Sequence, residues 1–275
     1  MERGTGKVQV HVGLIDGPVQ LSHPELNTTR FQTLGKGSSP ACSRHSSFAC
    51  MHGTFVAGIL ASKRGSAAPA ICPGCTILLR PIFGESARAV PVATAGDLAA
   101  AIVDCVDAGA HVVNLSAALL SATGTEQTVV RNALDHASAR GTIIVAAAGN
   151  DSIIGSTAIT RHPWVIPVVA YDVAGRPLAL SNLGASIGRS GLGAPGQRIT
   201  SLSAAGPPRT FDGTSVATPF VAGAIALLRS EFPGVAATAI REAVDAVRAG
   251  RRVSLMPPLL DAWGAYKRLA ALRRT

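Results

Sequence analysis

Short apolar runs rich in valine and isoleucine alternate with alanine-rich segments of helical length along most of this chain. That alternation is typical of a parallel β-sheet with helices on both faces, because parallel strands are buried on both sides and read as nearly continuous apolar runs. The sequence therefore predicts an α/β fold in three layers, with a mainly parallel central sheet. No linker is long or polar enough to divide the chain, so we expect residues 1–275 to form a single domain.

Each apolar run and each helical segment gives an expected element. We expect strands at 8–16, 76–83, 111–116, 141–150 and 164–172, and helices at 53–62, 94–109, about 125–140, 215–230 and 236–250. A glycine-rich section at 181–214 precedes the helix at 215–230, which is the most hydrophobic of the set. A helix of that kind is expected in the interior of the protein.

The net charge of the chain indicates which classes of partner it could bind. The formal net charge is +9, an excess that would suit acidic peptides or nucleic acid. Much of it lies at 248–252 and 266–275, which show no aromatic interleaving and no groove-reading motif, so we expect a solvated basic tail and no nucleic acid partner. We find no apolar run that could span a membrane and no signal peptide at the N-terminus, so we expect a cytoplasmic protein without a membrane partner.

The cysteine count is odd, so at least one cysteine has no partner within the chain. The five are Cys42, Cys50, Cys72, Cys75 and Cys105. Cys42, His45, Cys72 and Cys75 would make a zinc set, but its two halves come from different segments and only one has finger-like spacing. Two local disulfides or plain thiols therefore remain the favoured alternatives, and we expect no metal. Cys105 lies in an apolar run and is expected in the core.

Two residues at the start of the chain have both a plain and a chemical interpretation. Asp16 ends an apolar run and is followed by Gly-Pro, which marks an ordinary turn but also suits an acid held at the end of a buried strand. His52 stands directly before Gly-Thr at the expected start of a helix. The small residues after it would let its backbone approach other elements closely, which an ordinary surface histidine does not need.

Two further residues carry the same ambiguity. Ser215 stands between Gly-Thr and the apolar helix, where serine is most often an N-cap, but where it also suits a nucleophile at the positive end of the helix dipole. Asn150 ends the expected strand at 141–150 and could be a plain turn residue. Its amide could equally donate a hydrogen bond to the oxyanion of a tetrahedral intermediate.

In the order Asp16, His52, Asn150 and Ser215, these signals resemble the subtilisin-like serine proteases. The matching motifs are "DGPVQLSHPEL", "HGTFVAGIL", "VVNLS", "AAAGN", "LSNLG", "GAPGQRI" and "GTSVATPFVAGAIALL", which together span roughly residues 10 to 230. The resemblance implies the three-layer subtilisin-like fold and a serine endopeptidase that works without a cofactor.

The resemblance also implies a role for each residue. Ser215 would be the nucleophile, His52 the general base and Asp16 the acid that orients the imidazole, while Asn150 and the Ser215 amide would form the oxyanion hole. A peptide or protein substrate would bind in extended form against cleft walls. The cleft residues implied are Asn114, Leu115, Ser116, Ala117, Ala118, Ala147, Ala148, Gly149 and Thr214.

Departures from the family pattern narrow the expected function. The "SAALL" segment replaces the usual glycines after the cleft serine, which alters the expected walls of the cleft. The acidic clusters of calcium-binding relatives are not evident, so we expect no required calcium. No propeptide precedes the first expected strand, which favours narrow specificity as the restraint on activity. With "CTILLRPIF", the Asp and His motifs most resemble the cyanobactin-type maturation proteases, which remove leader or follower segments from ribosomally made peptides.

Two alternatives stay open. Macrocyclising relatives carry an inserted helical lid, whereas residues 27–51 read as a short polar loop without helical period, so hydrolysis is favoured over macrocyclisation or other acyl transfer. A peptide-binding pseudoprotease is the second alternative, although all four catalytic positions are filled. Relatives commonly place Ser or Thr after the acid, but Gly17 has no side chain and Pro18 has no N–H, so we expect Asp16 to rely on His52 and the Gly17 amide.

Overall fold

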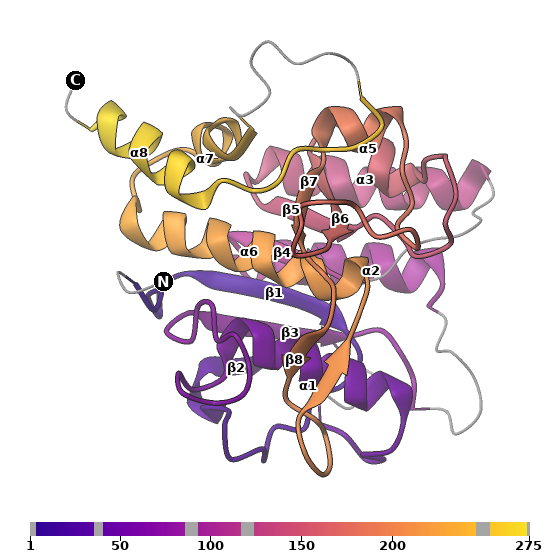
Figure 1. Ribbon diagram of the computed structural model, residues 1–275, viewed down its shortest axis with the longest axis vertical. Coiled ribbons are helices and arrows are strands. Elements are labelled where there is room, and N and C mark those ends of the chain that lie inside the picture. The colour runs from indigo at the N-terminus through magenta and orange to yellow at the C-terminus, as the bar shows by residue number, and fades with distance from the viewer. Residues whose placement is uncertain (1–3, 36–40, 86–92, 117–123, 246–253, 274–275) are drawn as a thin grey trace.

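The computed structural model describes residues 4–35, 41–85, 93–116, 124–245 and 254–273. Within them a parallel sheet of seven strands runs through the centre in the order β2-β3-β1-β4-β5-β6-β7 (Figure 1). The strands are β1 (His11–Asp16), β2 (Phe31–Thr33), β3 (Thr76–Pro81), β4 (Val112–Leu115), β5 (Ile143–Ala147), β6 (Val165–Tyr171) and β7 (Leu192–Pro195). All five expected strands are confirmed, each a little shorter than its apolar run.

The sequence did not predict four strands, and the two of them that belong to the central sheet, β2 and β7, lie at its edges. β2 has three residues and no buried side chain, and β7 lies in the glycine-rich section. Neither has the long apolar run of an interior strand, since an edge strand is covered by a neighbour on one side only. A short antiparallel pair, β8 (Ile199–Ser201) and β9 (Arg209–Phe211), lies beside the first long helix.

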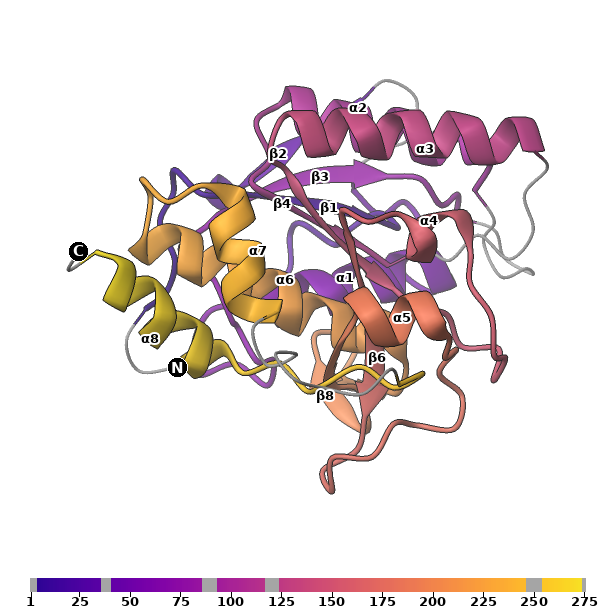
Figure 2. The same ribbon diagram turned by 90° about the horizontal axis from the view of Figure 1, so that it is seen from above.

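Helices cover both faces of the sheet. They are α1 (Phe48–Ala61), α2 (Ala95–Asp107), α3 (Gly124–Ala139), α4 (Ala158–Arg161), α5 (Ala185–Ser190), α6 (Thr214–Glu231), α7 (Ala237–Asp245) and α8 (Ala262–Leu272), with a 3-10 turn at Thr28–Arg30. In Figure 2, α2 and α3 lie together on one side of the strands, and α1 and α6 lie on the other. The three layers expected from the sequence are confirmed.

Alternation along each strand builds the two cores between these layers. In β1, Val12 and Leu14 join the core beneath α1 and α6, while Ile15 faces the core beneath α2. Successive side chains of a strand point to opposite faces, so a strand covered on both sides must be apolar throughout. No described helix is long and apolar enough to cross a membrane.

Two expectations about helices were wrong. Helix α1 begins at Phe48 rather than at residue 53, because Ser47 caps it by accepting a hydrogen bond from the backbone N–H of Cys50 at 3.1 Å. The stretch at 266–275 is not a solvated tail where it is described: α8 runs to Leu272 and buries Ala265 and Leu269 against the core. The charged residues on the outer face of α8 obscured its apolar face in the sequence pattern. The basic residues at 248–252, like the end of the helix expected at 236–250, lie outside the described residues.

Candidate active site

The candidate residues meet where the order of the strands changes direction. From β1 the chain builds β2 and β3 on one side of the sheet and β4 to β7 on the other. Connections leave in opposite directions at such a point, and open α/β sheets generally bind their ligands there, beside the carboxyl ends of the strands, which here are β1 and β4. Asp16 is the last residue of β1, and α1 and α6 bring His52 and Ser215 to it.

Asp16, His52 and Ser215 form one continuous line of hydrogen bonds. His52 Nδ1 lies 2.8 Å from Asp16 Oδ1, and His52 Nε2 lies 2.9 Å from Ser215 Oγ. Because an ionised carboxylate only accepts, the Nδ1 proton points at Asp16 and leaves Nε2 free to accept from the serine hydroxyl. Asp16 is fully buried, and the His52 side chain is 13% exposed. The arrangement can therefore withdraw a proton from Ser215.

The surroundings of Asp16 confirm the expectation of sparse support. Oδ1 accepts from the Gly17 N–H at 2.7 Å and from His52, while Oδ2 is buried without a hydrogen-bond partner in the described part of the chain. A Cβ atom on Gly17 would lie 2.1 Å from the carbonyl oxygen of Ala49 in α1. Packing of the α1 backbone therefore excludes any side chain at residue 17, and with it the hydroxyl that relatives commonly place there.

His52 differs from its expected position, although its packing agrees with the prediction. It lies within α1 rather than before it, one turn after the N-terminus of the helix. A Cβ atom on Gly53 would lie 2.5 Å from the carbonyl oxygens of Gly17 and Pro18, so the small residue after His52 is what lets α1 press against the end of β1.

Opposing effects set the pKa of His52. Burial of the imidazole lowers the pKa, but the negative charge of Asp16 and the hydrogen bond to it favour the protonated ring. The balance holds the pKa of His52 above its ordinary value of 6.5. A raised pKa makes the imidazole a better proton acceptor.

Ser215 is not an N-cap, so the plain interpretation of this residue was wrong. Helix α6 begins at Thr214, its N-cap is Gly213, and no side chain caps it. Ser215 is therefore the second helical residue, and no described residue accepts a hydrogen bond from its backbone N–H. Unpaired N–H groups are normal in the first turn of a helix, where they carry partial positive charge. The hydroxyl and a free N–H donor of the same residue thus lie at the positive end of a buried helix.

Asn150 lies just beyond the end of β5 and is held by its amide oxygen. Asn150 Oδ1 accepts from the Thr214 N–H at 2.9 Å and from the Thr214 hydroxyl at 3.0 Å. The same hydroxyl accepts from the Gly149 N–H at 3.2 Å. Among the described residues nothing accepts from Asn150 Nδ2, and the residue is exposed. Asn150 therefore offers a fixed, unused donor, and the role of Thr214 in fixing it was not visible in the sequence.

Most of the expected cleft residues are buried or paired with neighbouring strands, so they are not open to a substrate. Asn114 and Leu115 are buried in β4, and their backbones pair with β1 and β5, so a peptide could meet this strand only from Ser116 onward. Four others that are described are also buried, namely Ala147, Ala148, Gly149 and Thr214. Ala117 and Ala118 lie outside the described residues.

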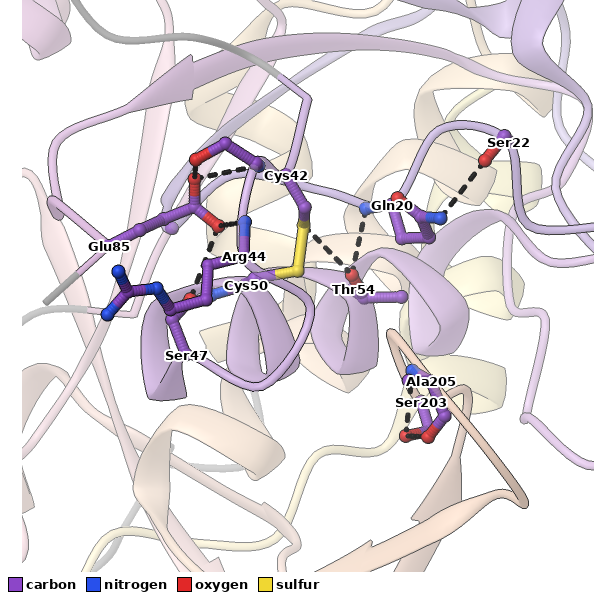
Figure 3. The surroundings of a disulfide bond; sticks show 12 residues. Gln20, Ser22, Cys42, Arg44, Ser47, Cys50, Thr54, Glu85, Ser203 and Ala205 are labelled. Atoms are coloured by element: carbon purple, nitrogen blue, oxygen red, sulfur yellow. Dashed lines mark hydrogen bonds between the residues drawn. A yellow bond between two sulfur atoms is a disulfide. The ribbon is translucent and has the colours of Figure 1, made fainter. Parts of the chain in front are cut away.

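The cysteines form neither the conceived zinc set nor the full pair of local disulfides. Cys42 and Cys50 form a disulfide (Figure 3), which removes Cys42 from the conceived zinc set. His45 is exposed. Cys72 and Cys75 are buried free thiols, so only one of the two local disulfides is present. Cys105 is fully buried, as expected, and desolvation raises the pKa of its thiol to about 12.

Comparison of the sequence with known families and proteins gives one consistent result. Residues 7–247 match the sequence model of the subtilase family. Subtilisin from Bacillus pumilus is 29% identical over 241 residues, which cover 86% of this chain and 82% of that protein. Subtilisin NAT from Bacillus subtilis subsp. natto is 28% identical over 86% of this chain but only 59% of its own length, so the chain spans just part of that relative.

Solved structures share the architecture over nearly the whole chain. A mutant of the protease domain of PatA superimposes with a TM-score of 0.87 at 32% identity, covering 98% of each chain. The prenylagaramide maturation protease PagA gives a TM-score of 0.81 at 28% identity, covering 96% of this chain and 95% of its own. The PatG macrocyclase in complex with a peptide gives 0.82 at 19% identity, a likeness of fold alone over 98% and 93% of the two chains. The expected subtilisin-like fold is confirmed.

Proposed function

The chain belongs to the subtilase family of subtilisin-like serine endopeptidases, and we propose that it hydrolyses peptide bonds through an acyl-enzyme formed on Ser215. The observation that carries this proposal is the line of hydrogen bonds from Asp16 Oδ1 through His52 to Ser215 Oγ. A serine hydroxyl is a weak nucleophile at neutral pH and needs an adjacent base that a third group orients.

In the proposed first half of the reaction, Ser215 Oγ attacks the scissile carbonyl carbon as its proton moves to His52 Nε2. The imidazolium formed there is stabilised by the buried Asp16 carboxylate, and it then protonates the leaving amine as the C–N bond breaks. In the second half, water attacks the acyl-enzyme ester, again giving its proton to His52. The carboxyl product leaves, and the Ser215 hydroxyl recovers its proton.

Charge that develops on the carbonyl oxygen needs donors that are already in place. Asn150 Nδ2 and the Ser215 N–H are the two donors we assign to it, because both lack an acceptor among the described residues. Asn150 cannot turn its oxygen toward the oxyanion without losing both hydrogen bonds from Thr214. The wrong end of the amide is thereby kept away from the developing charge.

We further propose that specificity is narrow, such as leader removal from a ribosomally made peptide bound in extended form, and that residues 1–275 act as one peptidase domain. Support comes from the likeness to PatA and to PagA, of which PagA is described as a maturation protease. Hydrolysis is favoured over macrocyclisation, because the described residues between Asp16 and α1 contain one 3-10 turn and no longer helix. An aligned triad favours an enzyme over a peptide-binding pseudoprotease.

A peptide library read by mass spectrometry tests the proposal. The wild-type protein should cut a narrow subset of sequences, and each pair of fragments should together weigh one water more than the parent peptide. A product that lacks the added water would identify a transferase or macrocyclase instead. Tight peptide binding with no product, equal in the wild type and Ser215→Ala, would identify a pseudoprotease.

A further inference from the structure

A phenylalanine covers one face of the proposed catalytic base. Phe48 is the first residue of α1, and its ring stacks on the imidazole of His52 one turn further along, with centroids 5.8 Å apart and planes inclined by 28°. The residue is nevertheless 47% exposed. A large aromatic side chain left half in water beside a reacting group leaves apolar surface open to whatever binds there.

The segment that leads into Phe48 is held by a cross-linked polar cluster (Figure 3). The disulfide from Cys42 to Cys50 ties this segment to the first turn of α1. Within it, the Glu85 carboxylate accepts hydrogen bonds from the backbone N–H groups of Ser43 and Arg44 and from the hydroxyls of Ser43 and Ser47. Partial burial acts to raise the pKa of Glu85, but the hydrogen bonds together outweigh it and hold the pKa below its usual value. The start of α1 is thus fixed before a substrate arrives.

Binding sites that are fixed in advance lose less entropy when a ligand binds. The segment contains no helix before Phe48, so these cross-links, rather than helical hydrogen bonds, set where the phenylalanine ring stands. In the sequence the same residues read only as a short polar loop. Two of the serines that gave them that character, Ser43 and Ser47, donate hydrogen bonds to Glu85.

We propose that Phe48 is a specificity-determining residue, whose exposed ring receives an apolar side chain of the substrate directly next to the scissile bond. This inference rests on the proposed function. The attacked carbonyl carbon must come within about 3 Å of Ser215 Oγ, and that oxygen is 2.9 Å from the imidazole on which Phe48 stacks. A neighbouring substrate side chain can therefore reach the ring. Leucine, valine, phenylalanine or proline would bury area against it, whereas an acidic side chain would lose hydration without gaining a partner.

Paired peptides test this assignment. A peptide that the wild type cleaves is made with leucine or with serine at each of the two positions that flank the cut, and kcat/KM is measured for every member. We expect the wild type to prefer leucine at one of these positions by about tenfold or more, and Phe48→Ala to remove most of that preference. Phe48→Asp should instead favour lysine at the same position, and an acid is well tolerated in the first turn of a helix.

A matched control variant accompanies the test, and failure of the Phe48 assignment can be told apart from failure of the proposed function. Val129→Ala truncates a half-exposed apolar residue on α3, on the opposite face of the sheet, and should leave the preference unchanged. A leucine preference that stays within about twofold of the wild type in Phe48→Ala, or no shift toward lysine in Phe48→Asp, would overturn the assignment. A folded wild type that cleaves no peptide would instead refute the proposed function, and this inference with it.

Discussion

The two ends of the candidate active site are supported very differently. At the acid end, one oxygen of Asp16 carries both hydrogen bonds, and the other is buried with none in the described part of the chain. At the oxyanion end, Thr214 donates twice to Asn150, and its hydroxyl also accepts from Gly149. One end is held by close backbone packing around a single side chain, and the other by a small network.

The backbone also differs between the two ends. At the acid end the backbones of α1 and β1 approach so closely that residue 17 has no room for a side chain. At the oxyanion end, Gly213 adopts φ +140°, a conformation that glycine tolerates, and Asn150 lies against it within side-chain contact distance. The acid end therefore holds His52 through a single hydrogen bond, whereas the oxyanion end holds Asn150 through two.

Replacing Asp16 should have the largest effect of the substitutions that test this contrast. In Asp16→Asn the carboxylate that selects the histidine tautomer is lost, and with no second group at hand we expect kcat/KM to fall by about 10⁴. The assay is cleavage of a peptide selected from the library, with folding checked by circular dichroism. A loss of less than about tenfold would mean that Asp16 does not orient His52.

Replacing Asn150 should cost less. We expect Asn150→Ala to lower kcat by about 10² to 10³, a size borrowed from the same kind of substitution in a subtilisin, a relative of this chain. Thr214→Val keeps the shape of the buried side chain but leaves Asn150 with the backbone donor alone, so about a tenfold loss is expected. Equal losses in the two variants would show that the network has no redundancy.

Adding a methyl group at residue 17 tests the packing itself. Gly17→Ala should destabilise the fold by about 1–3 kcal/mol, because its Cβ meets the backbone of α1 and not a movable side chain. Urea unfolding gives the free energy of unfolding directly. As a control, Gly234→Ala adds the same methyl group where nothing lies within 4 Å, and should change stability by less than about 0.5 kcal/mol. If Gly17→Ala left the free energy of unfolding unchanged, sterics would no longer explain why residue 17 lacks the hydroxyl that relatives commonly have there.

The smallest expected effect is on the pH profile of kcat/KM. The raised pKa of His52 sets the direction in which activity changes with pH. Only the neutral imidazole can accept the serine proton, so kcat/KM should fall as the pH drops through a midpoint above 6.5. In Asp16→Asn both effects that raise the pKa disappear while burial remains, so the midpoint of the residual activity should move to lower pH. A midpoint that stays in place would mean that another group governs the profile.

The sequence predicted the interior of this molecule better than its edges. Interior strands and the buried helix α6 carry apolar runs that only one environment explains, whereas β2, β7 and α8 carry short or mixed patterns. Asp16, His52, Asn150 and Ser215 were each ambiguous alone, and it was their order along the chain, within motifs that resemble one family, that identified them. The sequence could not show that Thr214 holds Asn150 or that a polar cluster surrounds Glu85, because these roles come from contacts between distant segments.

Active-site labelling is the sharpest test of the proposed chemistry, since it requires Ser215, His52 and the oxyanion donors to act together without any knowledge of the substrate. A fluorophosphonate probe should attach to one residue of the folded wild type, with Ser215 identified by peptide mapping, and Ser215→Ala should remain unlabelled. Labelling should slow in Asn150→Ala and slow further in Asp16→Asn. A folded wild-type protein that stays unlabelled, or a label found on a residue other than Ser215, would contradict the proposed mechanism.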